Sequence, residues 1–335
     1  MNTRFAQHIL QQPQRIAMPI GVYAGLEMTK ATVKDAVSDA NAQTEAVLAL
    51  HEYFHTPVML TAMDLSAESE AFGCQIRITE EEIPTVLGRL VTSPAEIKKL
   101  PLPQVGEKRT QVHLDTASQL IKQKPNYPVL GGCIGPFSLA GRLFGVSELM
   151  ELTINDEEAT LMLIEKATRF LTQYILAFRE IGAWGVIMAE PAAGLLSPRS
   201  LAKYSMDFIR NITSVVQNEN FTLIYHNCGA KIVHLPKILD SNLEVIHFGA
   251  PMDLINALHQ AQEKVIISGN LDPTAIFHSS TPSEVKAQTL QLLKDTAPYK
   301  AYIISSGCDI PPGTPLANLE AFYEAVTEFN QQKDT

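Results

Sequence analysis

The chain has 335 residues, of which 46% are hydrophobic and 19% charged, and this balance is typical of a folded globular protein rather than a disordered one. Its formal net charge is −10, from 26 basic and 36 acidic residues, and the basic residues form no cluster. Such a chain lacks the positive surface that a phosphate backbone requires, so we exclude nucleic acid as a partner.

The N-terminus and the cysteines indicate the compartment. Residues 1–15 lack the apolar run of a signal peptide, and no run approaches the roughly 18 apolar residues of a membrane span. We therefore expect a cytoplasmic protein with no membrane partner. The four cysteines, Cys74, Cys133, Cys228 and Cys308, are far apart in the sequence, which favours reduced thiols over a disulfide framework.

Eight short apolar runs recur along the chain and predict strands. They cover residues 15–23, 56–62, 127–133, 184–190, 221–227, 243–249, 264–270 and 301–307. Their apolar character is continuous, which is typical of parallel strands that are buried on both faces. Eight strand–helix units in about 300 residues predict one α/β domain, a (β/α)8 TIM barrel over residues 1–335.

Helical stretches separate most of these runs. Their clearest start signals are TPSE at 281–284, NDEE at 155–158 with Asn155 as the N-cap, and the segment that begins at Thr314. Residues 72–103 break the alternation, because they change from a strand-like pattern to acidic and proline-rich sequence. We predict that they form an excursion after the second strand, with a hairpin that covers part of the barrel mouth.

Three residues of the types that bind metals follow two of the predicted strands. His226 and Cys228 end the fifth run, and residues two apart in an extended segment point the same way. Cys308 holds the corresponding place after the eighth run. Because catalytic groups of this fold gather where strands end, and an eight-stranded barrel is narrow, we expect the three side chains to meet.

One histidine and two cysteines form a ligand set that prefers zinc and leaves a fourth tetrahedral position open. Two thiolates cancel the charge of Zn²⁺, so such a site is better suited to holding a substrate thiol as thiolate than to activating water. The alternative is that His226 and Cys228 are packing residues, since buried cysteine is common in protein cores. Cys74 and Cys133 have no histidine near them in the sequence and are assigned to packing.

Five other polar residues near the predicted mouth are weaker candidates. Asp64, Glu190 and Asp272 are expected to orient the metal ligands or the thiol substrate through hydrogen bonds, and Asn270 and Asp309 to contact the cofactor. A structural role is the alternative, in which Asp272 caps a turn and Asp64 caps a helix.

Three motifs point to a known family. They are YHNCG at 225–229, GNLDP at 269–273 and GCDIPPGTPLANLEAF at 307–322. Together they resemble the uroporphyrinogen decarboxylase superfamily, and within it the corrinoid-dependent branch typified by methylcobalamin:coenzyme M methyltransferases. The resemblance runs over essentially the whole chain. It implies a barrel of that family's type and a zinc ion held by His226, Cys228 and Cys308.

The resemblance also implies a reaction. A thiol such as coenzyme M would bind the zinc as thiolate and attack the methyl group of a methyl-corrinoid in an SN2 step that leaves Co(I). The corrinoid is expected to be carried by a separate small protein that docks over the barrel mouth. One departure concerns the acidic residue that coenzyme M enzymes carry after the sixth strand, because Gly249 and Ala250 stand there. A water, His247 or another carboxylate would then be the fourth ligand.

Three alternatives stay open. The enzyme could run in the opposite direction and methylate Co(I) from a methyl donor. It could be a true uroporphyrinogen decarboxylase, although that enzyme is expected to carry an arginine-rich N-terminal segment, and residues 11–25 supply only Arg15. It could also be a binding or accessory protein that keeps the barrel without turnover.

Overall fold

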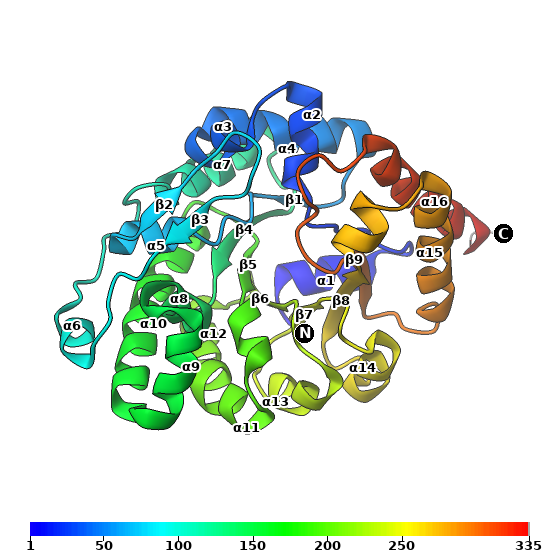
Figure 1. The fold of residues 1–335 in the computed structure, drawn as a ribbon. Helices are drawn as coiled ribbons and strands as arrows, with labels where there is room; N and C mark the ends of the chain where they lie inside the picture. The colour runs from blue at the N-terminus through cyan, green and yellow to red at the C-terminus, as the bar shows by residue number, and fades with distance from the viewer. Residues whose placement is uncertain (334–335) are drawn as a thin grey trace.

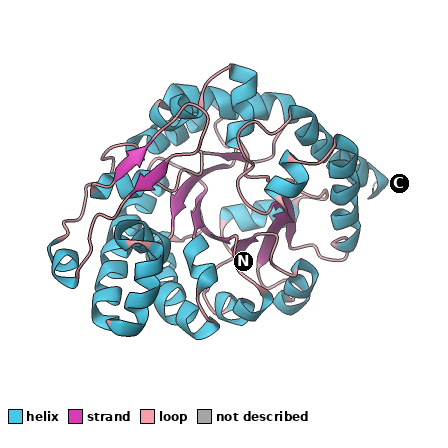
Figure 2. Ribbon diagram, viewed as in Figure 1, coloured by secondary structure: helices cyan, strands magenta, loops and turns pink. Residues whose placement is uncertain are grey.

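A curled sheet of seven parallel strands forms the centre of the molecule, and helices surround it (Figure 1, Figure 2). The structure is a computed structural model that describes residues 1–333. The strands lie in the order β1-β4-β5-β6-β7-β8-β9. They are β1 (Met59–Leu60), β4 (Val129–Ile134), β5 (Gly185–Ala189), β6 (Thr222–Asn227), β7 (Val245–Phe248), β8 (Ile266–Leu271) and β9 (Tyr302–Ser306). The architecture is a TIM-barrel-like α/β fold, as the apolar runs predict.

Helices connect the strands and cover the outside of the sheet (Figure 2). In the first half of the chain they are α1 (Arg4–Gln11), α2 (Leu26–Thr29), α3 (Val33–Ser38), α4 (Ala40–Phe54), α5 (Ala67–Phe72), α6 (Pro94–Lys99), α7 (Thr110–Gln123), α8 (Pro136–Phe144), α9 (Val146–Asn155) and α10 (Glu157–Glu180). In the second half they are α11 (Pro198–Leu201), α12 (Asp207–Val216), α13 (Leu235–Leu239), α14 (Leu254–Ala261), α15 (Pro282–Asp295) and α16 (Leu316–Lys333). No helix within residues 1–333 has the length and apolar character to cross a bilayer.

Burial explains why the strands read as continuous apolar runs. Every residue of β4, β5, β6, β7 and β9 is buried, and in β8 only Asn270 is half-buried. One face of the sheet packs inward and the other packs on helices, so neither face favours alternating polar residues. Seven of the eight predicted runs contain a strand.

The first run, 15–23, differs from this prediction. It forms a single bridge, in which Ala17 pairs with Ile304 of β9, flanked by a 2.9 Å hydrogen bond from Met18 N to Ile304 O. Pro19 has no N–H to continue a ladder, and the chain then turns into a short 3-10 helix at Val22–Gly25. No backbone ladder within residues 1–333 joins this segment to β1, so the sheet is open there.

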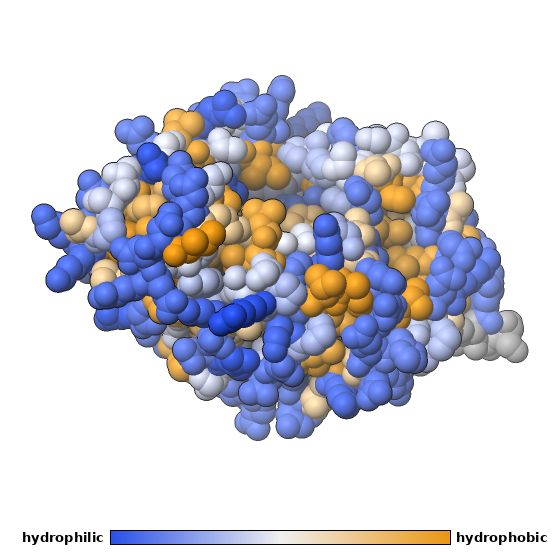
Figure 3. All heavy atoms as spheres, turned by 60° about the horizontal axis from the view of Figure 1, so that its bottom comes forward, coloured by the Kyte–Doolittle hydropathy of each residue, from blue (hydrophilic) through white to orange (hydrophobic). Residues whose placement is uncertain are grey.

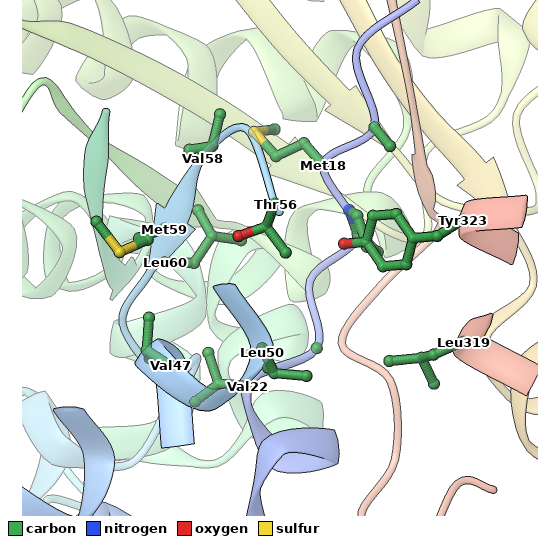
Figure 4. A pocket seen from close by; sticks show the side chains of 13 residues that line it. Met18, Val22, Val47, Leu50, Thr56, Val58, Met59, Leu60, Leu319 and Tyr323 are labelled. Atoms are coloured by element: carbon green, nitrogen blue, oxygen red, sulfur yellow. The ribbon is translucent and has the colours of Figure 1, made fainter. Parts of the chain in front are cut away.

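Side-chain packing fills the gap between the two edges of the sheet (Figure 4). A cavity of about 40 Å³ remains at this seam, too small for a cofactor. It is lined by apolar side chains from the first segment, β1, α4 and α16, including Met18, Val22, Val47, Met59, Leu60 and Leu319. The seam is therefore a packed join between the sheet edges and lies outside the candidate site.

The predicted excursion contains a two-stranded antiparallel hairpin. It consists of β2 (Gln75–Arg77) and β3 (Thr85–Leu87), and α6 follows it. A backbone hydrogen bond of 2.9 Å from Leu90 N to Leu143 O attaches the segment after the hairpin to α8. In Figure 1 the hairpin lies beside the ring of strands and does not cover its centre.

The amino-terminal ends of the strands are closed by structural contacts. In Figure 1, α1 lies behind the ring, and Arg4 N donates to Glu219 O, just before β6, at 2.6 Å. Arg15 is buried at the same end, where its guanidinium donates to the carbonyls of Tyr302 at 2.9 Å and Thr296 at 3.0 Å. The opposite, carboxyl-terminal end of the sheet is left for a site.

The observed N-caps of two helices can be compared with the caps predicted from the sequence. Thr281 caps α15 and Glu284 returns the bond to the Thr281 N–H, which is the predicted capping box. The N-cap of α10 is Asp156, whose side chain accepts from Ala159 N at 3.0 Å, so the prediction of Asn155 is wrong by one residue. Both residue types can cap a helix, and the sequence pattern alone does not separate adjacent candidates.

Candidate metal centre

The structure brings His226, Cys228 and Cys308 together at the carboxyl-terminal end of the sheet. One potential ligand atom of each lies within 4.8 Å of the others. His226 is buried inside β6, while both cysteines are half-buried in the segments that follow β6 and β9. No other group of three His, Cys, Asp or Glu residues in the described part of the chain has this arrangement. The side chains meet as the strand-end argument predicts.

Two glycines allow the loops that carry the cysteines to approach. A Cβ on Gly249 would lie 2.3 Å from the carbonyl oxygen of Cys228, and one on Gly307 would lie 2.8 Å from Ala250 N. Both distances are too short for a side chain, so the backbones after β6, β7 and β9 touch only because these residues are glycine. Residue 249 therefore has no room for the carboxylate that coenzyme M enzymes are expected to carry near this place.

The two thiols interact directly with each other. A hydrogen bond with Cys308 lowers the pKa of the Cys228 thiol to about 7, although burial acts in the opposite direction. The same bond, together with burial, raises the pKa of Cys308 to about 12. Cys228 is thus the thiol that more readily ionises near neutral pH, and thiolate is the form that binds metals.

His247 lies against His226 on the neighbouring strand. Its Nδ1 is 2.8 Å from Nδ1 of His226, and its Nε2 is 2.9 Å from Oγ of Ser305. Burial, and then the neighbouring His226, hold the pKa of His247 well below its usual range. Because both ring nitrogens of His247 already have partners, His247 does not supply a fourth ligand atom in this arrangement.

Two of the predicted acidic residues are engaged by neighbouring groups. The carboxylate of Asp64 forms a buried ion pair with Arg109 and accepts hydrogen bonds from Ser66. Asp272 accepts 2.9 and 2.8 Å hydrogen bonds from Thr274 N and Ala275 N, which caps the short helix after β8. Asp272 is thus the cap that the sequence leaves as the alternative, whereas Asp64 pairs with an arginine and does not cap α5.

Glu190 holds the start of α8. Its two carboxylate oxygens accept from Phe137 N and Ser138 N, each at 2.8 Å, and Ser205 Oγ lies 3.2 Å away. Burial raises the pKa of Glu190 to about 7, although these hydrogen bonds oppose the shift. The carboxylate thus bridges the end of β5 and the first turn of α8, next to β6.

The two candidates for cofactor contact differ in their surroundings. Asn270 donates to Gly249 O at 3.1 Å and Met252 O at 2.9 Å, so it fixes the loop that packs on Cys228. Both side-chain oxygens of Asp309 are buried and have no hydrogen-bond partner within residues 1–333. Burial, and then the neighbouring Cys308, raise the pKa of Asp309 well above its usual range.

Some relevant residues were not singled out from the sequence. Sequence patterns assign no role to Ser305 or Arg109 and offer His247 only as a direct ligand. A signal existed for two of them, because His247 and Ser305 are polar residues inside strands that are otherwise apolar. Arg109 precedes a helix in an ordinary polar stretch, and no local pattern connects it to Asp64.

The donor set fits a zinc ion. One imidazole and two thiols, one of them ionisable near neutral pH, are the ligand types that zinc prefers, and three protein ligands leave a position for a substrate. Cys74 and Cys133 are both buried away from this group, and burial raises the pKa of Cys74 to about 11 and that of Cys133 well above its usual range.

The sequence is similar to known methyltransferases and decarboxylases. The family model of uroporphyrinogen decarboxylase (URO-D) matches residues 13–329. The chain is 27% identical to the methylcobamide:CoM methyltransferase MtbA of Methanosarcina acetivorans over 87% of this chain and 86% of that protein. It is 23% identical to the uroporphyrinogen decarboxylase of Pseudoalteromonas atlantica over 99% and 98% of the two chains.

A solved structure has the same fold over nearly the whole length. A methyltransferase from Methanosarcina mazei superposes with a TM-score of 0.88 at 22% identity, and the match covers 98% of both chains. At this identity the likeness shows the fold alone. The sequence relatives include both methyltransferases and decarboxylases, so the reaction must be argued from the site.

Proposed function

The chain belongs to the uroporphyrinogen decarboxylase family, and from that premise we propose that it is a methyltransferase of the corrinoid-dependent branch. The proposed reaction moves a methyl group from a protein-bound methyl-corrinoid to a small thiol, with coenzyme M as the first candidate because of the name of a relative. The thiol releases its proton to solvent, its sulfur forms the new S–CH₃ bond, and cobalt keeps the electron pair of the broken Co–CH₃ bond. The meeting of His226, Cys228 and Cys308 is the observation that carries the proposal.

His226, Cys228 and Cys308 would hold the metal. A zinc ion bound there supplies a charge that keeps a substrate thiol in its thiolate form at neutral pH. Gly249 and Gly307 let the two cysteine loops approach, and Asn270 fixes the loop after β7. We assign Asp309 to the wall of the thiol site, because it follows Cys308 and its oxygens have no protein partner in the described residues.

The position of Arg15 argues against decarboxylation of a tetrapyrrole. A substrate with several carboxylates requires cationic side chains near the reacting group, and Arg15 was the one arginine in the segment expected to supply them. Arg15 is instead buried at the amino-terminal end of β9, where it donates to Tyr302 O and Thr296 O. The group of His226, Cys228 and Cys308 also has no role in decarboxylation. Decarboxylation is therefore only the second candidate, and the names of other relatives are what support it.

Exposed apolar side chains beside the site support docking of a corrinoid protein. Leu195 is 69% exposed and Val233 is 58% exposed, and they lie in the segments that follow β5 and β6. These segments touch, because a Cβ on Gly194 would lie 2.7 Å from the backbone of Gly229. Figure 3 shows one face of the molecule, which is largely hydrophilic with apolar patches set into it. We propose that the corrinoid protein covers this patch. We also propose that the chain acts as one barrel domain in which residues 15–23 take the place of the eighth strand.

The experiment compares three reactions on the purified protein. Demethylation of methylcobalamin by thiols, methylation of cob(I)alamin by methylated thiols, and decarboxylation of uroporphyrinogen are followed under the same conditions. The proposal expects the first reaction, lost in Cys228→Ala and kept in Cys133→Ala. Dominance of the second reaction would reverse the direction, and activity in the third alone would overturn the proposal.

A separate variant tests the proposed docking patch. Leu195→Glu places a charge on the exposed patch without touching the metal ligands. We expect it to slow methyl transfer from a corrinoid protein while leaving the reaction with free methylcobalamin unchanged. Equal rates of wild type and variant with the protein-bound corrinoid would contradict this docking surface.

A further inference from the structure

A chain of buried hydrogen bonds runs from His226 across the sheet. His226 Nδ1 and His247 Nδ1 are 2.8 Å apart, and His247 Nε2 is 2.9 Å from Ser305 Oγ. Ser305 Oγ in turn donates to the carbonyl oxygen of Met18 at 2.6 Å. His226 and His247 lie opposite each other in the register of β6 and β7. All three side chains in this series of hydrogen bonds are buried.

The hydrogen bond from Ser305 to Met18 determines which atom is the donor in each of the other hydrogen bonds. A carbonyl oxygen can only accept, so the single hydroxyl proton of Ser305 is committed to Met18. Ser305 must then accept from His247, which places the proton of the neutral His247 ring on Nε2 and leaves a lone pair on Nδ1. The facing Nδ1 of His226 must therefore carry the proton that lies between the two rings.

We infer that His247 and Ser305 are positioning residues that select the tautomer of His226, so that its Nε2 presents a lone pair to a metal ion. This inference rests on the proposed function, because a metal at His226 gives the tautomer its use. A metal binds the unprotonated nitrogen of a neutral imidazole, and the hydrogen bond at the other nitrogen sets which one that is.

Loss of the serine would remove the selection. Without Ser305 as an acceptor, His247 is free to carry its proton on Nδ1 and to donate it to Nδ1 of His226. His226 would then hold its own proton on Nε2, and that nitrogen would have no lone pair for the metal. Outer hydrogen-bond partners of metal-binding histidines typically change metal affinity by about 10- to 100-fold. We expect Ser305→Ala to weaken zinc binding within that range.

The chain offers a matched control on the next strand. Ser268 of β8 lies opposite His247 in the strand register and is also fully buried, but its hydroxyl has no hydrogen-bond partner within residues 1–333. Ser268→Ala therefore removes a buried serine hydroxyl beside the same histidine without breaking the hydrogen-bond chain. It should bind zinc as the wild type does.

Two substitutions of His247 separate the hydrogen bond from packing. In His247→Asn the side-chain oxygen can take the place of Nδ1 as an acceptor toward His226, whereas His247→Leu removes the acceptor and keeps an apolar side chain. We expect His247→Asn to retain more zinc affinity than His247→Leu. Equal loss in both would show that the acceptor does not matter and would overturn the inference.

The test measures zinc affinity by competition with a chromophoric chelator and ring protonation by ¹⁵N NMR of the metal-free protein labelled at histidine. The expected result is a protonated Nδ1 on His226, a protonated Nε2 on His247, and weaker zinc binding in Ser305→Ala than in Ser268→Ala. A proton on Nε2 of His226, or equal zinc affinity in the two serine variants, would overturn the inference.

The NMR readout also keeps this inference separate from the proposed function. A wild-type protein that shows the expected tautomers but takes up no zinc would contradict the metal-based function while supporting the hydrogen-bond assignment. A protein that binds zinc and transfers methyl groups but has the opposite tautomers would support the proposed function and contradict the hydrogen-bond assignment.

Discussion

The two halves of the sheet differ in what they bury. Strands β1, β4 and β5 consist of apolar residues and glycine, with Cys133 as the most polar member. Strands β6 to β9 are also buried, apart from Asn270, but they include His226, His247, Ser268 and Ser305. A buried polar group is costly unless it is hydrogen-bonded, so its presence in a fully buried strand requires a reason.

The first half buries its ionisable side chains in loops and helices, where they hold the fold together. Asp64 pairs with Arg109, Glu68 accepts from Ile134 N at 2.9 Å, and Glu190 binds the start of α8. These buried acids therefore have structural roles, whereas the buried histidines of β6 and β7 lie at the candidate metal centre. Substitutions of these first-half acids should change stability, whereas substitutions of His226, His247 and Ser305 in the second half should change metal binding.

Arg109→Met should have the largest effect on stability. The substitution leaves Asp64 buried without its cation, and breaking a buried ion pair in this way typically costs about 3–5 kcal/mol. Urea unfolding measures the loss, and metal analysis of the folded fraction should give the same zinc content as wild type. A drop of zinc in folded protein would show that the two halves are not independent.

Glu68→Gln should change how stability depends on pH. Burial raises the pKa of Glu68 from 4.5 to about 8 in the folded protein, so the folded state holds a proton that the unfolded state releases. The stability from this group is fully present below pH 4.5 and is lost as the pH rises through about 8. The loss is on the order of 5 kcal/mol, because each unit of pKa difference corresponds to about 1.4 kcal/mol.

The variant has no carboxyl to ionise, so its stability should fall less between about pH 5 and pH 9. Glu190, whose pKa is raised by burial to about 7, leaves part of the pH dependence in place. Denaturant midpoints at the two pH values measure the difference. A variant with the same pH dependence as wild type would show that Glu68 ionises as an exposed carboxyl does.

Glu190→Gln should have an intermediate effect. The amide keeps the volume of the side chain but replaces one acceptor by a donor that faces a backbone N–H of Phe137 or Ser138. A buried donor without a partner costs about 1–3 kcal/mol. Thermal unfolding measures this loss, and the zinc affinity should not change. Weaker zinc binding would return Glu190 to the group of residues that orient the ligands.

Asp272→Ala should have the smallest effect, because it removes only the cap of the short helix after β8. Loss of such a cap costs about 0.5–2 kcal/mol. Thr281→Ala is the matched control, since Thr281 caps α15 through the same kind of bond. Similar stability loss in both with unchanged methyl transfer is expected. A rate loss confined to Asp272→Ala would support its predicted place in the site.

The sequence was sufficient for those parts of the fold that depend on local patterns. Seven buried strands, the hairpin after β1 and the capping box at Thr281 follow from runs and caps that a window of residues contains. The run at 15–23 is not a strand because its apolar residues pack at the seam, while Pro19 limits pairing to one bridge. Packing and pairing both favour apolar residues, and composition does not distinguish them.

The candidate site was predictable to a similar extent. The convergence of His226, Cys228 and Cys308 followed from their positions at strand ends, because the fold brings those ends together. The partners of Asp64 and His247 lie 45 and 58 residues away, in Arg109 and Ser305, and depend on the tertiary structure. A sequence shows which residues are polar and buried but does not show which of them touch.

The most direct test of the account is the zinc content of untagged wild-type protein beside Cys308→Ala and Cys133→Ala. Cys133 is the matched control, because it is a buried cysteine on β4 outside the group of three. We predict one zinc per chain in wild type and in Cys133→Ala, and a sharp drop in Cys308→Ala. Wild-type protein that takes up no added zinc, or a Cys308→Ala protein that keeps it fully, would contradict the account.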